Sequence, residues 1–286
     1  MNIVRILSFF TFFQITVTDT SVWIYGATTS EKMLLSSETF YKDTVMTVKI
    51  DEIFVDIFYP GVDRSVGNIL VLPGWNFPRQ DWCQKSSLCR KASEAGYCLI
   101  FPEMGKSVYS GEFYPETLQE WKVYPGKKWV LDSLIPTLQK KYHLLKNNQK
   151  NYLLGLSTGG RGVALIALER SDLFKAGAAL SGDFDQTQMP QDRLMIGFYG
   201  SYQQFPERWK GEDNPQMQIA KFQIPLYLGH GKQDKIVPPE QTLHFYEALK
   251  KAHPQLNLKL NMPDAGHDYA YWDSELKAVL EFFALF

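Results

Sequence analysis

Short apolar runs alternate with helical stretches along most of this chain. The runs are rich in β-branched and aromatic residues and cover 68–72, 97–101, 151–155, 176–180, 225–229 and 256–260. Near-continuous apolar runs of this kind are typical of strands buried on both faces of a parallel sheet. The earlier segment 45–59 alternates between apolar and polar positions, which predicts an antiparallel hairpin.

Helical periodicity fills the intervals between these runs. The segments with this period are 80–95, 127–142, 159–169, 240–252 and 273–286. Strands that alternate with helices predict a mainly parallel central sheet with helices on both faces. A length of 286 residues suits one large domain of this α/β class, and no linker or internal repeat marks a second.

One long segment, 183–221, has neither a strand period nor a helix period. It is rich in Gln, Pro, Gly and aromatic residues, and a segment of this length inside a domain usually has a function. We predict a small cap insertion that covers a site at the end of the sheet. Its aromatic side chains either line a pocket or pack as ordinary core: Phe198, Tyr199, Tyr202, Phe205 and Trp209.

The first residues are typical of a targeting segment. Arg5 precedes the apolar run 6–17, and no acidic residue occurs before Asp19. This pattern predicts a signal peptide over residues 1–20, a domain over 21–286, and export to the periplasm or the outside. The run is too short for a comfortable bilayer span, so we expect no stable membrane insertion after processing. The alternative is an N-terminal strand packed on the domain.

Charge and cysteine content exclude several classes of partner. The 30 basic and 31 acidic residues give a net charge of −1, which argues against binding to nucleic acid or an anionic membrane surface. Cys83 and Cys89 lie six residues apart in a stretch that reads as one helix, where they face different sides, so we expect free buried thiols there and at Cys98. A Cys83–Cys89 disulfide is the alternative if the protein is exported. None of the three cysteines has a neighbouring His or a second Cys at metal-ligand spacing, so no metal site is expected.

The strongest chemical signal is a glycine-flanked serine between a strand and a helix. In Gly155-Leu156-Ser157-Thr158-Gly159, the glycines permit a tight turn that exposes the serine hydroxyl at a helix N-terminus. This context predicts that Ser157 is a nucleophile. A glycine-rich turn with an ordinary capping serine is the alternative.

A serine nucleophile needs a base and an acid, and the chain order Ser, Asp, His restricts the choice. Of five histidines, only His267 lies in a loop after the last strand and before the final helix, so we predict it as the base. Asp234 lies in the loop after the preceding strand and is the predicted acid. The competing carboxylates are Asp183, Asp185, Asp264 and Asp268.

An acyl-transfer site also needs N–H donors for the developing oxyanion. One donor is expected from the backbone of Thr158, and the other from the loop Pro73-Gly74-Trp75-Asn76, where Gly74 permits close approach. We predict Trp75 as this donor, with Asn76 as second choice. The predicted substrate-binding residues are Asn76, Tyr202 and Trp209.

Six motifs together resemble an esterase family of α/β-hydrolases that contains esterase D (S-formylglutathione hydrolase), feruloyl and acetylxylan esterases, enterochelin esterases and the mycolyltransferases. The motifs are Ser107-Val108-Tyr109-Ser110, Leu134-Ile135-Pro136 with Lys141-Tyr142, Gly155 to Gly160, Leu180-Ser181-Gly182-Asp183-Phe184-Asp185, Asn214-Pro215 and Gly266-His267-Asp268-Tyr269-Ala270-Tyr271-Trp272. The resemblance implies the α/β-hydrolase fold and a triad at Ser157, Asp234 and His267. The family often has Met at the position of Thr158, and His or Asp at that of Pro73.

The resemblance implies an enzyme that needs no cofactor. Together with the residues, it predicts a serine hydrolase that cleaves a small-molecule carboxylic ester or thioester through an acyl-enzyme on Ser157. Acyl transfer to an alcohol is one alternative, since it differs only in the acceptor that enters after acylation. A non-catalytic binding protein on the same scaffold is the other.

Overall fold

The computed structural model describes residues 3–8, 11–18, 21–26, 33–35, 43–61 and 65–286. The chain divides into two units, Met1–Tyr41 and Lys42–Phe286. The first unit contains a four-stranded antiparallel sheet of β1 (Ile3–Ser8), β2 (Thr11–Thr18), β3 (Ser21–Gly26) and β4 (Met33–Leu35). The predicted signal peptide overlaps β1 and β2, while its residues 1–2, 9–10 and 19–20 lie outside the described residues. Export therefore stays a prediction.

The second unit is built on an eight-stranded sheet in the order β12-β11-β10-β9-β7-β8-β6-β5. Its strands are β5 (Thr44–Ile50), β6 (Ile53–Tyr59), β7 (Gly67–Leu72), β8 (Tyr97–Pro102), β9 (Asn151–Leu156), β10 (Ala176–Leu180), β11 (Leu226–Gly229) and β12 (Leu258–Asn261). From β12 to β8 all neighbours are parallel, and β5 and β6 form the predicted antiparallel hairpin. Every residue of β7, β8, β9, β10 and β11 is buried, as their continuous apolar runs predict.

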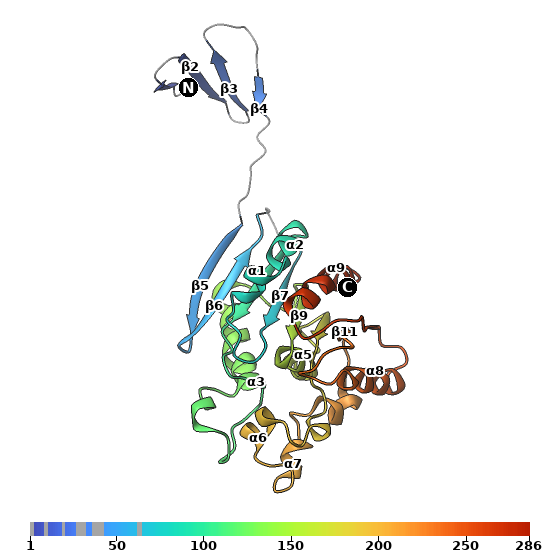
Figure 1. Cartoon of the computed structure of the whole chain (residues 1–286). Helices are drawn as coiled ribbons and strands as arrows, with labels where there is room; N and C mark the ends of the chain where they lie inside the picture. The colour runs from blue at the N-terminus through green and yellow to red at the C-terminus, as the bar shows by residue number, and fades with distance from the viewer. Residues whose placement is uncertain (1–2, 9–10, 19–20, 27–32, 36–42, 62–64) are drawn as a thin grey trace. The chain divides into compact units, whose positions relative to one another are not determined.

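Helices cover both faces of this sheet (Figure 1). One face packs against α3 (Gly126–Trp129) and the helical turns η2 (Val130–Leu134), α4 (Ile135–Thr137) and η3 (Leu138–Tyr142) that continue it, and against α5 (Thr158–Glu169) and α8 (Glu240–Ala252). The other packs against α1 (Asp81–Lys85), α2 (Leu88–Glu94) and α9 (Tyr269–Phe283). Among the residues described, no helix is long and apolar enough to cross a membrane. The predicted α/β-hydrolase architecture is confirmed.

Segment 183–221 folds into short helices beyond the end of the sheet toward which β7 points (Figure 1). They are η4 (Gln186–Gln188), α6 (Arg193–Tyr199), α7 (Pro206–Trp209) and η5 (Pro215–Lys221). The segment has a small apolar core of its own that includes Met195, Phe198, Tyr199 and Trp209, together with Val108. That it acts as a cap stays a prediction.

A buried arginine ties this segment to α5. Arg161 is fully buried, and its guanidinium donates to Asp183 Oδ2 at 3.0 Å, to Gln186 Oε1 at 2.9 Å and to the carbonyl of Asp213. A buried charge is tolerated only when it is paired and hydrogen-bonded in this way. The segment is thus held at both ends by one residue of α5.

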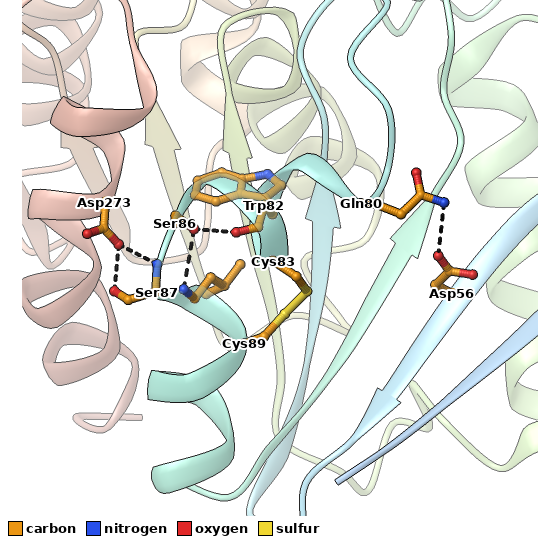
Figure 2. The surroundings of a disulfide bond; sticks show 9 residues. Asp56, Gln80, Trp82, Cys83, Ser86, Ser87, Cys89 and Asp273 are labelled. Carbon is orange, nitrogen blue, oxygen red and sulfur yellow. Dashed lines mark hydrogen bonds between the residues drawn. A yellow bond between two sulfur atoms is a disulfide. The ribbon is translucent and has the colours of Figure 1, made fainter.

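The expectation of free thiols at Cys83 and Cys89 is wrong, because the stretch 80–95 is not one helix. It breaks at Ser86 and Ser87 into α1 and α2, and the turn brings the two cysteine Cα atoms to 5.2 Å, where they form a disulfide (Figure 2). That separation is ordinary for such a bond. Cys98 is free and buried, as expected.

Candidate active site

Ser157 lies in a strained turn between β9 and α5. Its backbone has φ 53° and ψ −127°, a combination that L-residues rarely adopt and that tends to occur at functional sites. A side chain at Gly159 would collide with the carbonyls of Leu72 and Pro73, so only glycine lets α5 begin this close to the end of β7. The side chain of Ser157 is thereby presented at the helix N-terminus, as the motif predicts.

Asp234 and His267, the predicted acid and base, lie in direct contact. His267 Nδ1 lies 2.6 Å from Asp234 Oδ2, and the carboxyl side chain is inaccessible to solvent. Burial by itself would raise the pKa of Asp234, but hydrogen bonds from His230, His267 and the Val237 N–H hold that pKa well below its usual range. The acid is therefore ionised, and it fixes the Nδ1–H tautomer of His267, which leaves Nε2 as the basic atom.

Ser157 lies at the same edge of the sheet as Asp234 and His267. β9, β10, β11 and β12 are parallel neighbours, so the loops at their carboxyl ends, which hold the three residues, lie together. Trp272 links two of these loops: its ring packs edge-on against His267 at 5.1 Å between centroids, and its Nε1 donates to Ser181 Oγ at the end of β10. No hydrogen bond between the Ser157 and His267 side chains occurs among the described residues.

The four competing carboxylates are engaged elsewhere. Asp183 pairs with Arg161, and Asp185 caps η4 through the N–H of Thr187. Asp268 caps α9, and Asp264 lies on the surface near Lys232. The geometry therefore favours Asp234 as the acid.

Hydrogen bonding in the predicted oxyanion loop favours Trp75 over Asn76 as the backbone donor. The N–H of Asn76 already donates to the carbonyl of Gly105 at 2.8 Å, so it is not free to bind an oxyanion. In the described part of the chain the N–H groups of Trp75 and Thr158 have no acceptor. A Cβ at Gly74 would lie 3.2 Å from Ser157 Cβ, which places this loop directly against the predicted nucleophile. The tyrosine hydroxyl of Tyr109 supports the loop by donating to the carbonyl of Pro73 at 2.8 Å.

The predicted substrate-binding residues differ in accessibility. Asn76 is exposed and Tyr202 half-buried, so both can contact a ligand. Trp209 is fully buried, and its Nε1 donates to the carbonyl of Gly200. This packing favours a core role for Trp209 rather than a substrate contact. The sequence could not show this, because the pattern of aromatic residues in 183–221 does not reveal which rings face inward.

One residue of the site escaped the sequence analysis. His230 is fully buried, and its Nε2 lies 3.1 Å from Asp234 Oδ2. The flanking strand and helix patterns led to its exclusion as a catalytic base, but its position four residues before Asp234 is a signal that it belongs to the same loop.

Within the described ranges, no group of three or more His, Cys, Asp or Glu side chains is arranged to bind a metal ion.

Solved structures with the same fold include both esterases and peptidases. The substrate-bound fluorophosphonate-binding serine hydrolase F of Staphylococcus aureus is 20% identical, with a TM-score of 0.68 over 85% of this chain and 98% of that one. An S-formylglutathione hydrolase from Agrobacterium tumefaciens is 16% identical, with a TM-score of 0.65 over 99% of both chains. The acylaminoacyl peptidase of Pyrococcus horikoshii is 16% identical, with a TM-score of 0.64 over 96% of this chain but only 48% of that one. The resemblance to α/β-hydrolase esterases is confirmed.

The sequence itself matches one family model, described as the prolyl oligopeptidase family, over residues 89–286. The matched region contains Ser157, Asp234 and His267 and covers more than half of the chain. With this match and the site geometry together, the chain is a serine hydrolase of the α/β-hydrolase fold and belongs to the prolyl oligopeptidase family.

Proposed function

We propose that the protein hydrolyses a small-molecule carboxylic ester or thioester through an acyl-enzyme on Ser157. The observation that carries this proposal is the arrangement at the end of the sheet: a strained serine, an ionised Asp234 bonded to His267 Nδ1 at 2.6 Å, and two unengaged N–H groups beside the serine. Acyl transfer to serine requires these three elements and no cofactor.

The reaction follows from the roles of these groups. His267 Nε2 takes the proton from Ser157 Oγ as that oxygen attacks the acyl carbon, and the N–H groups of Thr158 and Trp75 bind the resulting oxyanion. His267 then returns the proton to the leaving alcohol or thiol, and the C–O or C–S bond breaks. Water then gives a proton to the same imidazole as its oxygen attacks the acyl carbon. The bond between the acyl carbon and Ser157 Oγ breaks, and His267 returns that proton to Oγ, which releases the acid and free Ser157.

Aromatic side chains next to the oxyanion loop support an apolar acyl group. The ring of Trp75 packs edge-on against Trp121 at 4.7 Å and against Phe198 at 6.0 Å between centroids. This cluster joins the oxyanion loop to segment 183–221, so we propose that the segment covers the acyl pocket. Selectivity then comes from apolar contacts, each of which contributes about 1–3 kcal/mol to discrimination.

Peptide-bond hydrolysis is the second candidate, and the family match favours it. The test compares p-nitrophenyl esters of increasing acyl length, feruloyl esters and S-formylglutathione with aminoacyl and N-acylaminoacyl p-nitroanilides. We expect kcat/KM for the best ester to exceed that for the best anilide by more than about a hundredfold. Anilides cleaved as fast as esters would overturn the ester proposal, and a competing alcohol that captures most of the acyl group would favour transferase activity.

A fluorophosphonate probe tests the nucleophile separately from the substrate. We expect one phosphonyl group per chain, located on the peptide that contains Ser157, and no labelling of the Ser157→Ala variant. Absence of labelling in the unmodified protein would instead support the non-catalytic alternative.

We also propose that the protein is exported. The Cys83–Cys89 disulfide supports this location, because disulfides persist in oxidising compartments. Fractionation of cells that express the full chain provides the test, and recovery of the protein only from the cytosol with both thiols reduced would refute it.

A further inference from the structure

We propose that His230 is a positioning residue of the active site, whose Nε2–H orients the Asp234 carboxylate toward His267. This inference rests on the proposed function, since it assigns a role within the same catalytic site. It begins from the observation that two imidazoles approach one oxygen: His267 Nδ1 at 2.6 Å and His230 Nε2 at 3.1 Å both lie next to Asp234 Oδ2.

The contacts of His230 define which of its nitrogens carries the proton. Nε2 faces two acceptors, Asp234 Oδ2 and the carbonyl of Val237 at 3.0 Å. A carbonyl and an ionised carboxylate cannot donate, so Nε2 must hold a hydrogen. Nδ1 lies 2.7 Å from Thr242 Oγ1, and this hydroxyl can donate to it. A neutral Nε2–H tautomer therefore satisfies every polar atom of this fully buried side chain.

The contacts of Asp234 show what that proton does. Oδ1 accepts the N–H groups of Ile236 at 2.8 Å and Val237 at 3.0 Å, and Oδ2 is bonded to His267 Nδ1 at 2.6 Å. The hydrogen on His230 Nε2 bonds to the carbonyl of Val237 at 3.0 Å, and Oδ2 lies 3.1 Å from the same nitrogen, close enough for a three-centre contact. The contact from His230, together with the bond to His267, sets the direction of Oδ2. A donor on Oδ2 also shares the negative charge that would otherwise act on His267 alone.

His230 is itself held by the sheet rather than by a loop. It follows β11 directly, and its N–H donates to the carbonyl of Asn261 at the end of β12 at 3.0 Å. The position of Asp234 Oδ2, which contacts His267, therefore depends on a residue that both β11 and β12 hold in place. Other titratable or charged groups near the pair are the exposed Lys232 and Lys235, Asp264 and Asp268 beside His267, and Tyr271 and Glu275 on α9.

Two substitutions of His230 distinguish loss of the Nε2–H donor from loss of the imidazole's packing volume. In His230→Gln the amide nitrogen reaches the position of Nε2 and can still donate to Asp234. In His230→Asn the shorter amide reaches only the position of Nδ1, so the bond to Asp234 is lost while the contact with Thr242 is kept. His253→Asn is the matched control, because it removes a histidine bond to the carbonyl of Ile219 at 2.7 Å, away from the triad.

Three readouts are measured on each variant: kcat and KM for the best ester, the midpoint of the acid limb of the kcat/KM profile, and the NMR titration midpoint of the His267 Cε1–H resonance in the unreacted protein. For His230→Asn we expect kcat to fall about tenfold or more with little change in KM, because base orientation acts on the chemical step. Both midpoints should rise by roughly half a pH unit or more, since the carboxylate then acts on His267 without a competing donor.

His230→Gln should restore the midpoints and most of kcat, and His253→Asn should leave all three readouts unchanged. Equal losses of kcat in both His230 variants with unmoved midpoints would overturn the proposal and leave His230 a packing residue. The NMR midpoint needs no turnover, so it decides the role of His230 even if no ester is hydrolysed, whereas failure of the proposed function is read from the absence of fluorophosphonate labelling.

A measurement on the unmodified protein covers the case in which the variants do not fold. The ¹⁵N shifts of the His230 ring distinguish a protonated Nε2 with an unprotonated Nδ1 from the opposite tautomer. The first result supports the proposal. A proton on Nδ1 alone would overturn it, because Nε2 could not then donate to Asp234.

Discussion

Removal of the Cys83–Cys89 disulfide should lower the stability of the protein by a modest and calculable amount. The cross-link closes a short loop, with a sequence separation of six residues. In the chain-entropy account, such a loop restricts the unfolded chain by about 2.2 kcal/mol at 25 °C. For a unit of this size, that change corresponds to a fall in Tm of about 4–9 °C.

The effect on activity should be much smaller, because other contacts hold the same turn against α9. The N–H and hydroxyl of Ser87 both donate to Asp273 Oδ1 on that helix (Figure 2), and the Trp82 ring packs edge-on against Tyr269. These contacts do not depend on the disulfide. We therefore expect kcat of the folded double variant to stay within about twofold of the unmodified protein.

Urea denaturation measures the difference in free energy of unfolding between the unmodified protein and the Cys83→Ser/Cys89→Ser variant. Both proteins are measured with and without a phosphine reductant. Reduction should destabilise the unmodified protein by the same amount and leave the double variant unchanged. A difference below about 0.5 kcal/mol would refute the loop-entropy reasoning. A difference above about 5 kcal/mol would show that the disulfide holds native packing rather than restricting the unfolded chain.

Four further results are expected. Asp234→Asn should lower kcat by about 10⁴-fold in steady-state assays while the protein stays folded, because the base loses its orienting charge. Arg161→Met should destabilise the fold by about 3–5 kcal/mol in urea, since Asp183 is left buried without its partner. Burial raises the pKa of Cys98 to about 12, so a thiol reagent at pH 8 should detect no thiol in the native protein and one after denaturation. Tyr202→Ala should shift kcat/KM unevenly across acyl lengths, whereas Trp209→Ala should lower Tm and reduce activity uniformly.

Most of the fold could be read from the sequence because buried parallel strands leave a continuous apolar signal. Each predicted run lies within a residue or two of an observed strand, from β7 to β12. The order of strands left no such signal: β7 lies between β8 and β9, and nothing in its own residues specifies those neighbours. The break at Ser86 and Ser87 was also missed, since periodicity continues across a short turn and hides the approach of the two cysteines.

The site shows the same division between local pattern and three-dimensional contact. The order of Ser157, Asp234 and His267 along the chain, each in a loop that follows a strand, was enough to single out the two side chains that the structure brings into contact at 2.6 Å, Asp234 and His267. Their roles as acid and base stay a prediction. The choice between Trp75 and Asn76 depended on a hydrogen bond to Gly105, which no spacing reveals. The role of His230 depended on where its ring points after β11 ends.

Arg161 has a consequence for how this scaffold can change its specificity. It lies one turn after Ser157 on α5, so the helix that begins at the proposed nucleophile also anchors segment 183–221 through Asp183, Gln186 and Asp213. Residues between these anchors, including α6 and α7, can be exchanged or lengthened while the anchors stay in place. Grafts confined to that interval should therefore yield enzymes with new acyl preferences, whereas grafts that include the anchors would leave a charge unpaired beneath the catalytic turn.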